Sequence, residues 1–360
     1  MLKIISTIYL LFLFGLQNSS AQTFNNFIEG KIIDAETNEA IPNVNVYLSN
    51  TRWGSTTNSD GYFRIKNIYP ASYQLVVSVL GFKTYMENID LTFKSNLHLN
   101  IKLIPQEISL SEISVTEERP DEWLENLALF KKLFLGKSRF ANQCFIENEY
   151  YLDFSEVNKK LIASCNQPLI IVNNALGFRI KCVLVKFIYD RVESHLEYKI
   201  TPWFEELQAS DTETKEMWES NRKIAYNGSL EHFISVFADD SFMKEGFKVY
   251  RNTRPFDLNK INRAPVVSSK NYMSSAADSN LRSFRFPDYL EIDFAGTSNI
   301  EEYERTKIVS WIKLISYEDL IDENGVSVSN SPFLTFGYWS QLGLADMLPL
   351  YMNFKEEIIK

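Results

Sequence analysis

The 360-residue sequence is poor in the residue types that most often signal a specific chemistry. It holds three histidines, three cysteines, 13 glycines and 11 prolines. So few glycines and prolines exclude a fibrous or linker-dominated chain. Basic side chains are outnumbered as well, and the formal net charge of −9 excludes a nucleic-acid binder that works by neutralising phosphates in bulk.

Long apolar runs are also absent, with one exception at the N-terminus. Lys3 precedes an apolar stretch over residues 4–16, and the small residues Ser19-Ser20-Ala21 follow it, which is the pattern of a secretory signal peptide. At about 1.5 Å per residue the apolar stretch spans about 20 Å, short of a hydrocarbon core of about 30 Å. We therefore predict a signal peptide over residues 1–21, no transmembrane span, and a secreted protein located in the periplasm or at the outer membrane.

Export places the few cysteines in an oxidising compartment. Cys144, Cys165 and Cys182 cannot all pair with one another, and their spacing fits no zinc knuckle. A buried free thiol behaves as a small hydrophobe. We expect buried structural thiols with at most one disulfide, and no nucleophilic cysteine.

The chain has ample material for packed cores, because 45% of its residues are hydrophobic and 14% are aromatic. Its charge divides unevenly. Residues 22–104 hold seven basic and seven acidic side chains, whereas residues 105–360 carry a net charge of −10. This division predicts a first domain at 24–104, an extended connector at 105–120 bracketed by prolines, and a second domain at 121–360.

The first domain shows the period-two alternation of β-strands and no helical periodicity. Asn58-Ser59-Asp60-Gly61 is a predicted turn, in which Gly61 supplies a positive φ and Asp60 bonds nearby backbone. Strands are expected at 27–33, 43–47, 62–65, 73–79 and 97–103.

A further set of residues in this stretch follows a known pattern: Gly30, Ile32, Asp34, Ala40-Ile41-Pro42, Val44, Val46, Thr57, Asp60-Gly61, Phe63, Tyr73, Leu75, Ser78 and Gly81-Phe82. Together they resemble the carboxypeptidase-regulatory-like domain over nearly all of residues 27–103. The resemblance implies a transthyretin-like β-sandwich of a kind common at the N-terminus of bacterial envelope proteins. It is the accessory module of metallocarboxypeptidases that is resembled, and not their catalytic domain.

No catalytic, cofactor-binding or metal-binding residue can be assigned from the sequence. A zinc peptidase needs two histidines and a carboxylate at ligand spacing, with a glutamate that activates water. His98, His195 and His232 form neither His-x-x-Glu nor His-Glu-x-x-His. His98 is expected at a solvent-facing strand position, and no cofactor is expected.

The second domain begins with a predicted helix over residues 121–136, with Asp121 as N-cap and Gly136 at its end. Its apolar face carries Trp123, Leu127, Phe130 and Phe134. Ser229 is predicted to cap another helix. Further strands are expected at 145–154, 160–165, 169–172, 178–189, 195–200, 289–294 and 306–316, a helix at 212–226, a long loop at about 252–282 and a turn at 322–325. The pattern is typical of an α+β domain with a mostly antiparallel sheet.

Two dense motifs occupy residues 226–233 and 337–351. With Cys144, Pro168-Leu169, Asn174 and Leu176-Gly177-Phe178, they resemble the C-terminal region of exported proteins that carry the same N-terminal module, a region without assigned chemistry. His232 is interpreted as a packed or capping residue rather than a catalytic base, because no nucleophile motif accompanies it. Asp346 is interpreted as a turn or cap residue.

These observations favour a non-catalytic envelope protein that binds a protein partner or a surface polysaccharide. The alternative is a hydrolase or glycan-processing enzyme whose site is built from carboxylates of the acidic second domain, because two carboxyl groups about 5 to 9.5 Å apart suffice for such chemistry. Paired carboxylates in a deep pocket would favour the enzyme, and a flat aromatic patch would favour binding.

Overall fold

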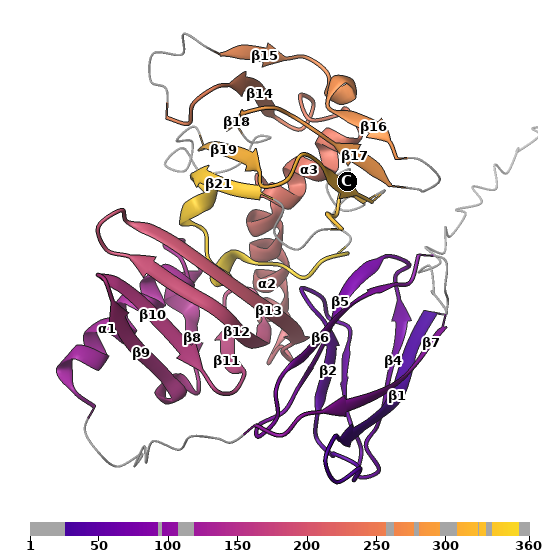
Figure 1. Cartoon of the computed structure of the whole chain (residues 1–360). Coiled ribbons are helices and arrows are strands. Elements are labelled where there is room, and N and C mark those ends of the chain that lie inside the picture. The colour runs from indigo at the N-terminus through magenta and orange to yellow at the C-terminus, as the bar shows by residue number, and fades with distance from the viewer. Residues whose placement is uncertain are drawn as a thin grey trace, which may run out of the picture.

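The computed structural model describes residues 26–92, 96–106, 119–256, 263–276, 281–295, 308–322, 324–328 and 333–352 (Figure 1). Its N-terminal part is a β-sandwich. One sheet has the strand order β4-β1-β7 and the other has the order β3-β2-β5-β6. The strands are β1 (Asn26–Asp34), β2 (Asn45–Leu48), β3 (Gly54–Thr56), β4 (Tyr62–Ile68), β5 (Ser72–Ser78), β6 (Tyr85–Asp90) and β7 (Asn96–Leu103).

Period-two alternation builds the sandwich. Along β4, Phe63 and Ile65 are buried whereas Arg64 is exposed, so one face of the sheet packs on the other sheet and the opposite face meets solvent. Most strand pairs are antiparallel, but β1 runs parallel to β7.

The turn before β4 forms where it was predicted, with Gly61 at φ 75°. The side chain that organises it differs from the prediction. Asn58 Oδ1 accepts hydrogen bonds from the backbone N–H of Asp60 at 3.1 Å and of Tyr62 at 2.9 Å. Asn58 therefore has the role that was assigned to Asp60, because the first residue of the turn is the one whose side chain reaches the following amides.

The middle part of the chain is a six-stranded antiparallel sheet with the order β8-β11-β12-β10-β9, in which β13 also pairs with β12. Helix α1 (Asp121–Phe134) packs on it through Leu127, Phe130 and Phe134, as its apolar face predicts. The strands are β8 (Cys144–Ile146), β9 (Leu152–Val157), β10 (Lys160–Cys165), β11 (Leu169–Asn173), β12 (Phe178–Asp190) and β13 (His195–Glu206).

Three predictions for this part were wrong in detail. Pro120, not Asp121, is the N-cap of α1, and no side chain caps the helix, because proline's restricted φ suits the residue that enters a helix. The strand expected at 145–154 is interrupted by a 3₁₀ turn at Glu149–Tyr151. Strand β13 continues beyond residue 200 to Glu206 because its second half is buried against the sandwich.

The C-terminal part has two sheets around one core. The five-stranded sheet has the order β15-β14-β18-β19-β21, and the three-stranded sheet has the order β16-β17-β20. Helix α3 (Leu230–Ala238) lies between them, with Phe233 and Phe237 in the core. The strands are β14 (Phe247–Asn252), β15 (Ala264–Val266), β16 (Met273–Ser275), β17 (Arg282–Phe284), β18 (Tyr289–Phe294), β19 (Ile308–Leu314), β20 (Asp319–Ile321) and β21 (Phe333–Gly337).

Both helices that flank residues 227–229 form at the predicted positions. Helix α2 spans Thr212–Tyr226 and is capped by Asp211, whose side chain accepts from the N–H of Thr214 at 2.7 Å. Ser229 caps α3 by accepting from the N–H of His232 at 3.0 Å.

The stretch expected as a long loop at 252–282 instead contributes β15, β16 and the start of β17, because three-residue strands are too short to give a periodic signal.

The sandwich is joined to the middle sheet by strand-like contacts between residues 50–54 and β13. The N–H of Asn50 donates to Pro202 O at 2.8 Å, and the N–H of Phe204 donates to Thr51 O at 3.0 Å. The ring of Tyr47 stacks on Trp203 with centroids 5.6 Å apart. A Cβ at residue 54 would lie 2.3 Å from the indole of Trp203, which explains the glycine there.

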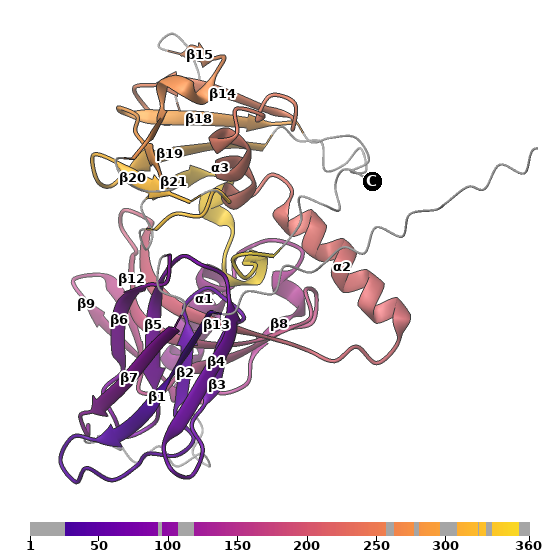
Figure 2. The ribbon, with the colours of Figure 1, turned by 90° about the vertical axis from the view of Figure 1, so that its right-hand side faces the viewer.

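A single segment near the end of the chain, residues 338–352, contacts all three cores. Trp339 is buried in the C-terminal core, Leu344 and Ala345 are buried in the middle core, and Tyr351 packs against the core of the sandwich. Figure 2 shows this segment running between the three parts. We call it the C-terminal strap. It fixes the sandwich relative to the rest of the molecule.

The predicted fold class is confirmed: an N-terminal all-β sandwich is followed by a β-rich part with helices and mostly antiparallel sheets. The signal peptide predicted at 1–21 and most of the connector predicted at 105–120 lie outside the described residues. The domain bounds stay a prediction. Within the described residues no helix is both long and apolar enough to cross a membrane.

Candidate functional site

The best candidate site lies on the five-stranded sheet, on the face opposite α3. Leu290, Ile292 and Phe294 of β18 point into the core, so Glu291 and Asp293 lie on the other face. The strand register aligns four residues in one row across this face: Tyr250 of β14, Glu291 of β18, Trp311 of β19 and Phe336 of β21. We call this surface the aromatic–carboxylate face.

The two carboxylates of this face are held by one arginine that precedes β15. Arg263 Nη1 lies 3.3 Å from Glu291 Oε1, and Arg263 Nη2 lies 2.9 Å from Asp293 Oδ2. The side chains of all three residues are buried, with exposed fractions of 9%, 4% and 3%. The guanidinium also lies 3.3 Å from the ring centroid of Tyr250. Asn252 Nδ2 donates to Glu291 Oε2 at 2.9 Å.

This geometry suits compensation of the two negative charges better than it suits proton transfer to a substrate. Two buried carboxylates without a cation would repel each other and lose hydration, and Arg263 offsets both effects through charge-assisted hydrogen bonds. A general acid and its partner must instead face a substrate across a gap. Here Glu291 and Asp293 face the arginine, which suits a structural ion triad better than an acid–base pair.

Aromatic rings surround the triad. Trp311 and Phe256 have ring centroids 4.8 Å apart, and Tyr289 and Phe336 have centroids 5.7 Å apart. Phe256 is 56% exposed, whereas the other three are half-buried. Lys313 Nζ lies 5.4 Å from the ring centroid of Tyr289. Half-buried rings beside an exposed one form a patch of the kind that marks binding surfaces.

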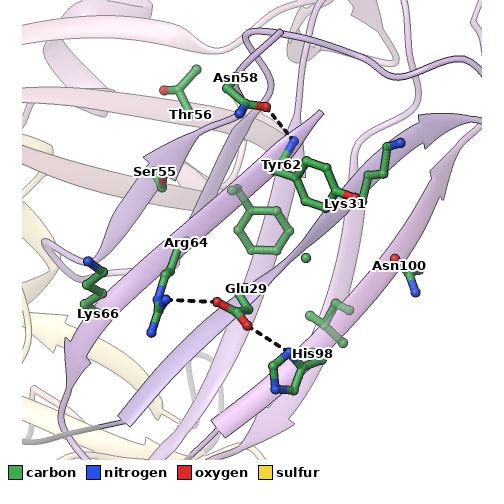
Figure 3. Close-up of a pocket in the computed structure, with 13 residues that line it drawn as sticks. Glu29, Lys31, Ser55, Thr56, Asn58, Tyr62, Arg64, Lys66, His98 and Asn100 are labelled. Carbon is green, nitrogen blue, oxygen red and sulfur yellow. Dashed lines mark hydrogen bonds and ion pairs between the residues drawn. The ribbon is translucent and has the colours of Figure 1, made fainter. Parts of the chain in front are cut away.

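The sandwich offers a second candidate, an open hollow on the outer face of the β4-β1-β7 sheet (Figure 3). Glu29 lies at its centre, with Arg64 Nη1 at 3.3 Å and His98 Nδ1 at 3.0 Å from its two oxygens. Lys31 Nζ lies 5.2 Å from the ring centroid of Tyr62. The lining also includes Ser55, Thr56, Asn58, Lys66 and Asn100.

The hollow has the character of an ordinary solvated sheet face. The side chains of Arg64 and His98 are 48% and 69% exposed, and exposed ion pairs contribute only about 0 to 1 kcal/mol. His98 occupies the solvent-facing strand position that the alternation predicts. No buried polar group points into the hollow among the residues that line it, so the aromatic–carboxylate face is the stronger candidate.

The histidine of the first dense motif is a packed residue. His232 is 3% exposed, and its Nδ1 accepts from the backbone N–H of Gly228 at 3.1 Å. Its ring lies within 5.0 Å of the rings of Tyr226 and Phe247. The interpretation of His232 as a packed residue at a helix start agrees with this geometry.

All three cysteines are free thiols. Burial raises the pKa of Cys144 to about 12 and that of Cys165 to about 11, and it raises the pKa of Cys182 further. Thiolates are therefore rare at neutral pH, which disfavours nucleophilic chemistry. Among the residues that the structure describes, no three histidine, cysteine or acidic side chains gather at metal-ligand spacing.

Asp346 of the second dense motif ends a 3₁₀ turn of the C-terminal strap, Leu344–Asp346, and accepts from the N–H of Gly343 at 3.4 Å. Burial raises the pKa of this carboxyl. The folded state therefore favours the protonated form, and the stability that this gives is lost as the pH rises through the raised pKa.

We expect Asp346→Asn, which imitates the protonated carboxyl, to raise the free energy of unfolding at pH 7 by an amount of the order of 1 kcal/mol. The gain should shrink toward pH 3.8, the carboxyl's ordinary pKa. Thermal melting of both proteins at the two pH values measures this. A lower melting temperature of the variant at pH 7 would contradict the prediction.

Sequence reasoning missed the aromatic–carboxylate face. Neither Arg263 nor Glu291 nor Asp293 belongs to a motif, and Arg263 falls in the stretch that was expected to be a loop. One signal was present: the strand predicted at 289–294 places two acidic residues between apolar ones with a spacing of two. Two acids on one face of a buried strand require a cation, and that requirement points to a partner elsewhere in the chain.

The chain has low sequence identity to the solved structures that it matches. No curated protein matches the chain. A Bacteroides uniformis protein described as a proposed carbohydrate-binding protein is 9% identical, covers 83% of this chain and 99% of its own, and has a TM-score of 0.19. A Bacteroides fragilis protein of unknown function, with a proposed membrane association, is 11% identical. The match covers 52% of this chain and 84% of that chain, and its TM-score is also 0.19.

A cohesin–X-dockerin complex from Acetivibrio cellulolyticus gives a match at 18% identity that covers 31% of this chain and 76% of that chain, with a TM-score of 0.21. At such scores these structures carry no argument about function. The family comparison is more informative, because residues 28–115 match the model of the CarboxypepD_reg-like domain. This range contains nearly all of the described sandwich, so the N-terminal part of the chain belongs to the CarboxypepD_reg-like domain family.

Proposed function

We propose that this protein is an exported, non-catalytic component of the cell envelope that binds a protein partner or a surface polymer through its aromatic–carboxylate face. The observation that carries the proposal is the cross-strand row of Tyr250, Glu291, Trp311 and Phe336, with the exposed ring of Phe256 beside it. Aromatic rings are enriched at recognition surfaces, and here they lie around an ion triad that is itself buried. The predicted signal peptide supports export.

The sandwich is attached to the rest of the molecule at two places. Two sets of contacts, at β13 and at the C-terminal strap, hold the sandwich against the other two parts. The carboxylates do not favour the alternative of a hydrolase, because Arg263 compensates them.

Crosslinking in intact cells, followed by affinity purification and mass spectrometry of the envelope fraction, tests the proposal. We expect a reproducible partner or polymer that is recovered with the wild-type chain and lost with Trp311→Ala. Tyr317→Ala is the matched control, because Tyr317 is 81% exposed and follows β19 outside the aromatic–carboxylate face. Recovery of the same partner with both variants would contradict the role of this face.

A further inference from the structure

We propose that the outer face of the β4-β1-β7 sheet of the sandwich binds an acidic polysaccharide. We call this surface the basic face; its charged side chains are Glu29, Lys31, Arg64, Lys66 and Lys102. It is separate from the aromatic–carboxylate face, so the inference goes beyond the proposed function and does not depend on it. Because exposed ion pairs contribute little to stability, those of this face are available to exchange partners with a ligand.

The charges of the sandwich are distributed unevenly. Residues 22–104 hold seven basic and seven acidic side chains, yet four of the basic ones and a single acidic one, Glu29, lie on the basic face. Of the other six acidic side chains, four lie at the turns that follow β1 and precede β4, and two lie on β6 of the other sheet: Asp34, Glu36, Glu39, Asp60, Glu87 and Asp90. With His98 counted as uncharged, the face carries a net charge of +3 on a protein of net charge −9.

The two basic residues of β4 lie apart from the acidic turns. Lys66 follows Tyr62, the first residue after the turn, by four residues, and Arg64 lies between them. At about 3.3 Å per residue Lys66 is about 13 Å along the strand from that turn, more than the screening length of about 8 Å at physiological ionic strength. The turns therefore reduce the positive potential at Lys66 very little.

The charged groups of the basic face are open to a ligand. The side chains of Arg64, His98 and Glu29 are 48%, 69% and 30% exposed. Neither Lys31 nor Lys66 forms an ion pair with another residue in the described part of the chain. Figure 1 shows β1, β4 and β7 on the side of the sandwich that faces away from the middle sheet, and every residue that lines the hollow belongs to the sandwich.

The carboxylate at the centre of the hollow selects among anionic ligands. Glu29 lies between Arg64 and His98, each of which contacts a different carboxylate oxygen (Figure 3). Each oxygen keeps a lone pair for a further donor. A ligand that presents negative charge alone is repelled at this point. An acidic polysaccharide presents hydroxyl groups between its carboxylates, so the hydroxyls donate to Glu29 while the carboxylates bind Arg64 and Lys66.

The uncharged residues of the face favour a polysaccharide over a membrane surface. Ser55, Thr56 and Asn100 line the hollow, and their hydroxyl and amide groups suit hydrogen bonds to sugar hydroxyls. A surface that inserts into a membrane presents several exposed apolar side chains, whereas Tyr62 alone among the apolar residues of the three strands is exposed on this face.

The test is biolayer interferometry of the purified chain from residue 22 onward on immobilised polymers. Alginate and polygalacturonate are the acidic polysaccharides, dextran is the neutral comparison, and polyglutamate is a polyanion without hydroxyl groups. We expect both acidic polysaccharides to bind, dextran not to bind, and polyglutamate to bind at least about tenfold more weakly, because it has no donor for Glu29.

The double variant Arg64→Gln with Lys66→Gln tests the basic face itself. We expect it to weaken the binding of alginate at least about tenfold, because two charge-assisted hydrogen bonds are lost. Lys199→Gln with Lys244→Gln is the matched control, since it removes the same charge from exposed positions outside the sandwich. Its affinity should change by less than about twofold, and both double variants should melt near the wild-type temperature.

Four results would overturn the inference. They are no binding of either acidic polysaccharide, equal binding of alginate and polyglutamate, equal loss of affinity in the two double variants, or tighter binding to vesicles that contain phosphatidylglycerol than to either acidic polysaccharide. The last result would assign the basic face to an anionic lipid surface.

Discussion

Replacing Arg263 by methionine is expected to lower the free energy of unfolding by about 3 to 5 kcal/mol, the usual effect of removing one partner from a buried ion pair. The reason is the charge left behind. Glu291 and Asp293 would remain buried on one face of β18 without their cation. Urea denaturation followed by tryptophan fluorescence measures the change.

Arg285→Met is the control for Arg263→Met. Arg285 pairs with Glu318 at 2.7 Å, but both side chains are at least 40% exposed, so the expected loss is at most about 1 kcal/mol. Adding Asp293→Asn to Arg263→Met should restore part of the lost stability, because it removes one uncompensated charge. Equal losses for the two arginine variants would contradict the account of the triad.

Truncating Tyr351 to alanine is expected to cost about 3 kcal/mol, the lower end of the range for large core aromatic residues, because its ring is partly buried against the core of the sandwich. Its ring contacts those of Trp53, Tyr69 and Tyr73 in the sandwich, and its hydroxyl donates to Asp322 Oδ2 at 2.9 Å. Burial and Asp322 raise the pKa of the phenol well above its ordinary value, so it remains a donor at neutral pH.

The backbone at Tyr351 supports this expectation. Its φ of 60° lies in the left-handed region, which costs a bulky residue about 1 to 2 kcal/mol. Packing of the ring must outweigh that cost. The C-terminal strap therefore contacts the sandwich through this side chain and through the N–H of Leu350, which donates to Asn50 O at 2.8 Å.

Small-angle X-ray scattering and thermal melting test the role of Tyr351. We expect Tyr351→Ala to increase the radius of gyration, because one of the two attachments of the sandwich loses its side-chain contacts. Tyr351→Phe keeps the ring contacts and loses the hydrogen bonds of the hydroxyl, including the one to Asp322, at a cost of about 1 to 3 kcal/mol. A radius and melting temperature of Tyr351→Ala equal to those of Tyr317→Ala would show that the strap does not hold the sandwich.

Elements governed by local interactions were predicted well from the sequence. Strand β10, helix α2 and the Ser229 cap of α3 were placed at their observed positions, because periodicity and capping depend on residues a few positions apart. The prediction of Asp121 as the N-cap of α1 was wrong for an equally local reason. Pro120 and Asp121 are both suited to a helix start, and only the chain's path into the helix decides which residue is the cap.

The candidate site depends on long-range contacts that local patterns do not contain. Arg263 meets Glu291 only because β15 pairs with β14 and β14 pairs with β18. The row that includes Trp311 and Phe336 requires the register of two further strand pairs. Tyr351 meets Tyr69 across most of the chain. Strand register and tertiary packing determine these neighbours. The sequence therefore shows which residues are present but does not predict which of them lie side by side.

Site-specific photocrosslinking in intact cells tests the central claim most directly. A photoactivatable phenylalanine analogue would replace Leu334, which is 44% exposed and lies opposite Lys313 on the aromatic–carboxylate face, or Tyr317 as the control position. The account predicts a crosslinked envelope component from position 334 that is absent from position 317 and is lost when Trp311→Ala is added. The same crosslinked product from both positions, or none from position 334, would contradict it.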